Sequence, residues 1–207
     1  LDKQWITLGW ALEAMALCCL FGRLPHRGLP MFAGILYALV GARLLFNPEI
    51  LEYQERGMPL FNWILYTYGI ATLCCLIGQS LLRRASDNGF IQQLANAIAL
   101  NGLLLGFWLV NLEILDYYST GPFIAISHGT GYSVKLALSA GWGLYAIVLL
   151  VTGVARDLKP LRYLSLGFLL LTVAKVFLYD LSELGGIFRV FSFLGLAVGL
   201  ILVSLFY

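Results

Sequence analysis

Five ionisable side chains fall within apolar stretches of this chain, where an unpaired charge is costly. They are Glu13, Arg43, Glu113, Lys135 and Lys175. An ionised group near the centre of a bilayer costs roughly 2.5–3.5 kcal/mol on insertion scales, so each needs a partner, water or a function. Carboxylates and basic groups held together could bind a polar head group, a saccharide or an anionic substrate. These residues therefore indicate where a binding site should be sought.

We expect the charged residues to form one polar cluster that opens at the external face of a membrane. Its predicted members are Arg43, Glu113, Asp116, Lys175, Asp180 and Arg189, with Glu13 as a deeper member. His128 lies on the same side, in a loop from Asp116 to Tyr132 that either covers the cluster as a lid or lies flat at the interface. The structural alternative pairs Lys175 with Asp180 or Glu13, and Arg189 with Glu183, so that the charges only close helix ends.

No motif for metal, nucleotide or cofactor binding accompanies these charges, and none is predicted. The sequence contains no phosphate-binding glycine loop and no H-E-x-x-H, and Ser127 and His128 lack a third partner for a hydrolytic triad. The cysteines form two adjacent pairs, Cys18-Cys19 and Cys74-Cys75. Neighbouring helical positions point about 100° apart, so such a pair cannot chelate a metal as C-x-x-C does. We expect buried thiols, with a link between the pairs as the alternative.

The composition is that of a membrane protein. Sixty per cent of the residues are hydrophobic and 12% are charged, and the mean hydropathy is +0.86. A soluble domain of this size could not bury so much apolar surface, so the lipid bilayer is the main expected partner. The net charge of +2 is small, and the basic residues are spread among loops rather than gathered in one patch. Both features argue against nucleic acid as a partner.

Apolar runs separated by turn signals predict an all-α, polytopic integral membrane protein with seven transmembrane helices. The predicted spans are residues 5–21, 30–46, 59–82, 91–115, 133–155, 160–181 and 187–207. Each is close to the roughly 20 residues that cross a 30 Å hydrocarbon core. We expect one transmembrane domain over residues 1–207, forming the C-terminal piece of a longer protein. Further spans of that protein, or other membrane proteins, are then additional partners.

The loops predict the orientation of the helices. Basic residues follow the first, third and fifth spans, whereas acidic residues follow the second, fourth and sixth. The positive-inside rule then places the N-terminus of this chain outside and Tyr207 in the cytoplasm. Leu-Cys-Cys-Leu recurs at residues 17–20 and 73–76, which favours tandem helical hairpins of one orientation, with chance similarity as the alternative. Pairs of small residues four apart, such as Gly102 and Gly106, predict close helix packing.

Motifs in the last third of the chain resemble a known family. They are Arg162-Tyr-Leu-Ser-Leu-Gly167, Thr172-Val-Ala-Lys-Val-Phe-Leu-Tyr-Asp-Leu-Ser-Glu-Leu184 and Arg189-Val-Phe-Ser-Phe-Leu-Gly195. Together with Ser139-Ala-Gly-Trp142, they are similar to the C-terminal hairpin of large bacterial membrane proteins that carry domain of unknown function 2339. The resemblance covers residues 133–207 and implies a long array of spans in the bacterial inner membrane, with no established reaction. Lys175, Asp180 and Arg189 match its motif by position.

Three functions are compatible with these features. The expensive intramembrane charges favour binding or translocation of a cell-envelope or lipid-linked compound through the external polar cluster. The second hypothesis is a structural subunit that packs against other membrane proteins through its small residues. The third is a membrane-embedded transferase acting on the external face, with His128 or Glu113 as its base.

Overall fold

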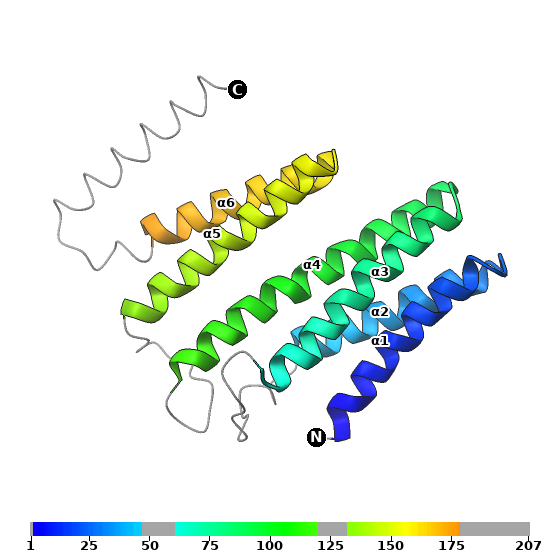
Figure 1. The fold of residues 1–207 in the computed structure, drawn as a ribbon, viewed down its shortest axis with the longest axis horizontal. Helices are drawn as coiled ribbons and strands as arrows, with labels where there is room; N and C mark the ends of the chain where they lie inside the picture. Colours follow the sequence, from blue (N-terminus) through cyan, green and yellow to red (C-terminus); the bar gives the residue numbers. More distant parts are fainter. Residues whose placement is uncertain (1, 47–60, 120–131, 179–207) are drawn as a thin grey trace. The chain divides into compact units, whose positions relative to one another are not determined.

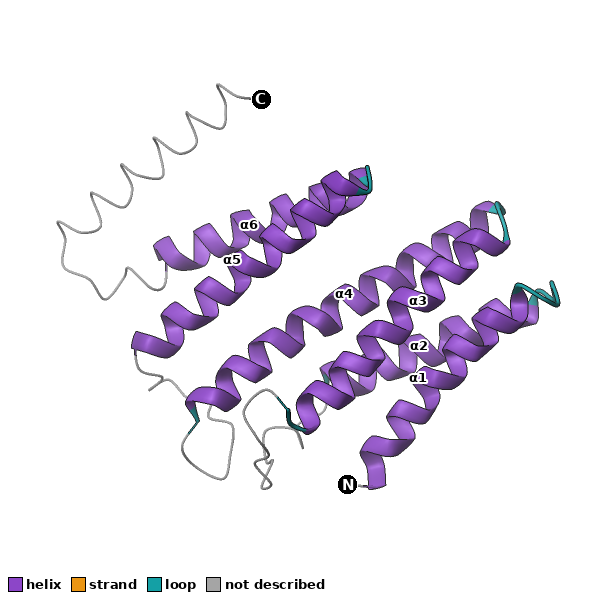
Figure 2. Cartoon of the chain, viewed as in Figure 1, coloured by secondary structure: helices purple, strands orange, loops and turns teal. Residues whose placement is uncertain are grey.

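The computed structural model describes residues 2–46, 61–119 and 132–178. Within these ranges the secondary structure is helical and contains no strand, so the predicted all-α class is confirmed (Figures 1 and 2). The elements are α1 (Asp2–Phe21), α2 (Gly28–Leu45), the π-helical turn η2 (Leu65–Gly69), α3 (Ile70–Ala85), α4 (Gly89–Tyr118), α5 (Tyr132–Ala155) and α6 (Lys159–Leu178).

Five described helical segments are long and apolar enough to cross a membrane. They are Gly28–Leu45, Leu65–Ala85, Gly89–Tyr118, Ser133–Ala155 and Lys159–Leu178. The apolar part of the first helix, Trp5–Phe21, is shorter than these. The predicted seventh span, residues 187–207, lies outside the described residues, as does the end of the sixth. The described structure thus supports a multi-pass membrane protein, and the number seven stays a prediction.

The chain divides into two compact units, Leu1–Ile126 (unit 1) and Ser127–Tyr207 (unit 2). In unit 1, α1 pairs with α2 and α3 pairs with α4, while α1 also packs against α3 and α2 against α4. Figure 1 shows the turns of both hairpins at the same end of this unit. Unit 1 is therefore a four-helix bundle of two hairpins that run in the same direction. In unit 2, α5 and α6 form a further hairpin.

Glycines allow the helices of unit 1 to approach one another closely. A Cβ atom added to Gly102 on α4 would lie 2.7 Å from the Cβ atom of Cys75 on α3. A Cβ atom added to Gly78 on α3 would meet the Tyr37 hydroxyl, and one added to Gly41 on α2 would meet the side chain of Asn101. The close packing predicted at Gly102 is thus confirmed, and it takes place between the two helices of one hairpin.

Neutral polar side chains link the helices inside unit 1. The Tyr37 hydroxyl donates a hydrogen bond to the Cys74 carbonyl at 2.7 Å, and the Tyr68 hydroxyl donates to the Leu44 carbonyl at 2.6 Å. Asn101 Nδ2 donates to the Tyr37 carbonyl at 2.9 Å. Lipid supplies no alternative partners for these groups, so the bonds help to specify which helix faces meet.

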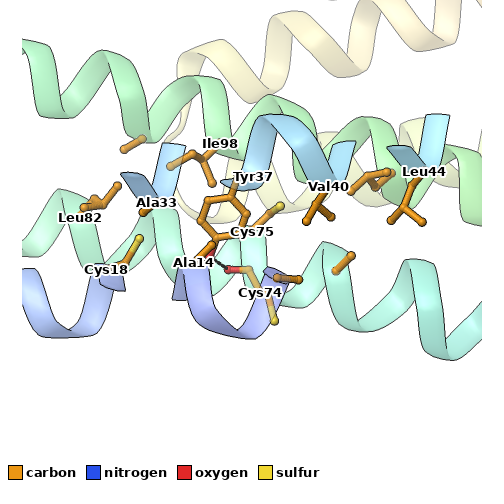
Figure 3. Packing of buried hydrophobic residues seen from close by; sticks show 14 of the residues in the cluster. Ala14, Cys18, Ala33, Tyr37, Val40, Leu44, Cys74, Cys75, Leu82 and Ile98 are labelled. Atoms are coloured by element: carbon orange, nitrogen blue, oxygen red, sulfur yellow. Dashed lines mark hydrogen bonds between the residues drawn. The ribbon is translucent and has the colours of Figure 1, made fainter. Parts of the chain in front are cut away.

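The cysteines lie mostly in the same core. All four are free thiols; Cys18, Cys74 and Cys75 are buried, whereas Cys19 is exposed. Figure 3 shows the three buried cysteines around the Tyr37 ring. Because adjacent helical positions face different directions, Cys18 points into the core and Cys19 points away from it.

Candidate polar site at the end of unit 1

A polar site lies where α4 ends and the third predicted span begins. Asn62 Nδ2 donates hydrogen bonds to Glu113 Oε2 and to Asp116 Oδ2, each at 3.1 Å. Asn62 Oδ1 accepts a hydrogen bond from the backbone N–H of Leu65 at 2.9 Å, which holds the amide in place beside the start of η2. Asn62 is only 3% exposed, so the amide is a fixed part of the protein interior.

The two carboxylates each have one oxygen without a hydrogen-bond donor among the described residues. Glu113 and Asp116 are three residues apart and share one face of α4. Glu113 Oε1 and Asp116 Oδ1 are both buried, and neither accepts a hydrogen bond from a residue that the structure describes. Buried acceptors without donors are costly, and two ionised carboxylates side by side repel each other. This arrangement suits a hydrogen-bond donor or a cation that would satisfy both oxygens at once.

Aromatic residues and an irregular backbone adjoin this site. Trp63, which follows Asn62, packs edge-to-face with Trp5 at 5.4 Å and with Tyr66 at 6.4 Å between ring centroids. Tryptophan and tyrosine prefer the membrane–water interface, so they mark this end of unit 1 as a membrane surface. The π-helical turn η2 begins three residues after Asn62. Such turns occur often at functional sites, where they change the direction of side chains.

The other predicted site residues of unit 1 do not join Asn62. The Arg43 guanidinium lies over the ring of Trp10, with 5.6 Å between Cζ and the ring centroid, a cation–π contact between α2 and α1. Glu13 is exposed on α1. Of the predicted cluster, the structure therefore brings together Glu113 and Asp116.

Lys175 lies in unit 2, where it joins α6 to α5. Its Nζ donates to Ser139 Oγ at 2.6 Å and to the Lys135 carbonyl at 3.2 Å. It also lies 5.7 Å from the centroid of the Trp142 ring. The remaining predicted members, His128, Asp180 and Arg189, lie outside the described residues. Their place in an external cluster stays a prediction.

Asn62 is the site residue that sequence reasoning missed. The search followed charges, and Asn62 is a neutral residue near the start of the predicted span 59–82. An amide within an apolar run was the available signal, because such a group needs a partner in lipid. Within the described parts of the chain, no three His, Cys, Asp or Glu residues stand close enough together to hold a metal ion.

Long apolar helices, aromatic residues beside one end of unit 1 and a polar site at that end define a multi-pass α-helical membrane protein. The family model described as predicted membrane protein (DUF2339) matches residues 24–207, and the chain belongs to this family. The match begins well upstream of residues 133–207, where the sequence motifs resemble the family, and so includes three helices of unit 1. No curated protein and no solved structure matches the chain.

Proposed function

We propose that this protein binds or translocates a cell-envelope or lipid-linked compound in the bacterial inner membrane, and that Asn62, Glu113 and Asp116 hold its polar group. The observation that carries this proposal is the pair of buried oxygens on Glu113 and Asp116 that no described residue satisfies. Ionised carboxylates only accept hydrogen bonds, so the ligand must donate them. Hydroxyl groups of a saccharide and the ammonium group of an amine head group are donors of this kind.

The distribution of arginines supports an external position for this site. Arg23, Arg27, Arg83 and Arg84 lie in or beside the two hairpin turns, at the end of unit 1 opposite to Asn62. By the positive-inside rule, that basic end belongs in the cytoplasm, and the carboxylate site then faces outward. A compound that reaches the site would thus come from the outer leaflet or from the external solution.

The test replaces the carboxylates by amides of the same shape. Purified, delipidated full-length chain is incubated with total lipid extract of a bacterial inner membrane, and the retained lipids are identified by native mass spectrometry. We expect one polar lipid class to bind, and the double variant Glu113→Gln, Asp116→Asn to lose it by about tenfold or more. Asp87→Asn, at the other end of the unit, is the matched control. Equal lipid retention by the double variant would contradict the proposal.

A structural role is the second candidate, and the position of Glu13 favours it. Glu13 lies near the middle of the apolar segment Trp5–Phe21 and is exposed on the surface of α1. A carboxylate facing lipid at this depth is expensive, so a partner helix that covers it would lower the cost. A photo-crosslinker at Glu13 should then capture a helix of the same assembly in native membranes. Crosslinks to lipid alone would argue against this role.

A further inference from the structure

An apolar groove runs along unit 1 between α1 and α3, away from the carboxylate site. Its volume is about 480 Å³, and its lining includes Met15, Ala16 and Cys19 from α1, Arg23 from the turn after α1, and Ile77 and Leu81 from α3. Arg23 is the charged residue of this lining; its other side chains are apolar or a thiol. The groove therefore offers contact area along its length and a positive charge at one end.

Helical spacing places a second arginine beside that end. Arg84 follows Leu81 by three residues and Ile77 by seven, so it continues the line of groove residues on α3. Arg23 lies two residues after the end of α1 and is itself part of the groove lining. Both arginines are exposed, and neither makes an ion pair with any residue that the structure describes. Two guanidinium groups are thus placed at the same mouth of the groove.

The depth of the groove corresponds to one leaflet of a bilayer. Met15 precedes Arg23 by eight residues. The first six of these steps lie in α1, and the last two lie in a turn closed by the hydrogen bond from the Arg23 N–H to the Leu20 carbonyl, so the separation is about 12 Å at 1.5 Å per residue. Half of a hydrocarbon core is about 15 Å thick. When the arginines lie at the membrane surface, the apolar wall therefore extends to nearly the middle of the membrane. An acyl chain that enters from the surface would follow this wall for most of a leaflet.

We propose that the groove binds one anionic phospholipid, with an acyl chain against the apolar wall and the phosphate held by Arg23 and Arg84. The charge complementarity is direct, because guanidinium groups bind phosphate oxygens through paired hydrogen bonds and the wall itself offers no competing polar group. The groove lies at the arginine-bearing end of unit 1, so this lipid site is separate from the polar site of Glu113 and Asp116. It would anchor the protein to lipids of one leaflet.

The first test changes the charge. Delipidated full-length chain in detergent is titrated with phosphatidylglycerol or phosphatidylcholine, and bound lipid is counted by native mass spectrometry. We expect one phosphatidylglycerol to bind in preference to phosphatidylcholine. Arg23→Gln should weaken phosphatidylglycerol about fivefold, and Arg23→Gln with Arg84→Gln about thirtyfold. Phosphatidylcholine should lose less, because its choline cation offsets the phosphate charge, so the preference for phosphatidylglycerol should disappear in the double variant. Arg27→Gln, in the same turn but not in the groove lining, is the control and should change nothing.

The second test changes the shape. Ala16→Trp fills the groove and should weaken both lipids, whereas Ile35→Trp, on the exposed face of α2, should weaken neither. Cys19 is the exposed cysteine and lies in the groove lining, so a photo-crosslinker attached there in native membranes reports what occupies the groove. We expect crosslinks to phospholipid. Crosslinks to a protein segment instead, or full phosphatidylglycerol binding by the double arginine variant or by Ala16→Trp, would overturn the proposal.

Discussion

The two units satisfy their internal polar groups in different ways. In unit 1, neutral groups of Tyr37, Tyr68 and Asn101 donate hydrogen bonds to backbone carbonyls of neighbouring helices. In unit 2, the described link between α5 and α6 uses the ammonium group of Lys175. A neutral donor is enough to orient packed helices, whereas an ammonium group adds a large desolvation cost. The difference shows that Tyr37, Tyr68 and Asn101 orient the helices of unit 1 without placing a charge between them, whereas the α5–α6 hairpin accommodates one.

The largest effect is expected from adding one methyl group at Gly102 in unit 1, where the neighbouring atom is a Cβ fixed to another helix. In Gly102→Ala, the new Cβ would lie 2.7 Å from the Cβ of Cys75, which cannot move without its helix. We expect the free energy of unfolding, measured by detergent titration, to fall by about 2 kcal/mol. Gly9→Ala is the control, because nothing lies within 4 Å of that position. Equal stability of the two variants would mean that unit 1 is not held by close packing.

Removal of a buried hydroxyl from unit 1 should have a smaller effect. Tyr37→Phe loses the 2.7 Å hydrogen bond to the Cys74 carbonyl, and Tyr68→Phe loses the 2.6 Å bond to the Leu44 carbonyl. Hydrogen bonds between membrane helices contribute about 0.6–1.7 kcal/mol, so each variant should lose roughly 1 kcal/mol of unfolding free energy. The two losses should add, because the bonds lie in different parts of the bundle. If neither variant lost stability, the neutral hydrogen bonds of unit 1 would not be what orients its helices.

Unit 2 should respond differently to loss of the charge and loss of its acceptor. Lys175→Met removes the partly buried charge together with its hydrogen bonds, and we expect the unfolding free energy to change by less than about 0.5 kcal/mol. Ser139→Ala keeps the ammonium group but removes its 2.6 Å partner, so it should cost about 1 kcal/mol. Normal membrane abundance of Lys175→Met with loss of the bound compound would favour a functional lysine. Loss of membrane abundance would instead indicate that the contact between Lys175 and Ser139 is needed for folding.

The smallest effect is expected at the surface of unit 2. Asp157, in the turn between α5 and α6, forms a 2.8 Å salt bridge with Arg162 on α6. The Asp157 side chain is 86% exposed. Asp157→Asn should therefore change the midpoint of thermal unfolding by an amount equivalent to less than about 0.5 kcal/mol. Asp157→Val should cost more, because residue 157 has a φ of 49° that a β-branched side chain disfavours. A large effect of Asp157→Asn would show that surface charge, rather than Lys175, holds this hairpin.

Much of the helical layout follows from short stretches of sequence. Predicted spans such as 91–115 and 133–155 fall within the observed helices α4 and α5, because apolar runs and turn residues are local signals. The polar site was only half predictable. Glu113 and Asp116 were found by their charge, but Asn62 is 51 residues from Glu113 and is neutral. Nothing local to residue 62 shows which carboxylate it will meet.

The amino-acid sequence by itself determined that this chain lies in a membrane, since no other solvent accommodates so many long apolar runs separated by short charged turns. It also determined where the described hairpins turn. For helices such as α1 and α4, the tertiary structure decided which side faces the neighbours, because helices that are apolar on nearly all sides carry little periodic signal of their buried face. That rotation places Cys18 inside and Cys19 in an open groove, and it brings one asparagine to two carboxylates.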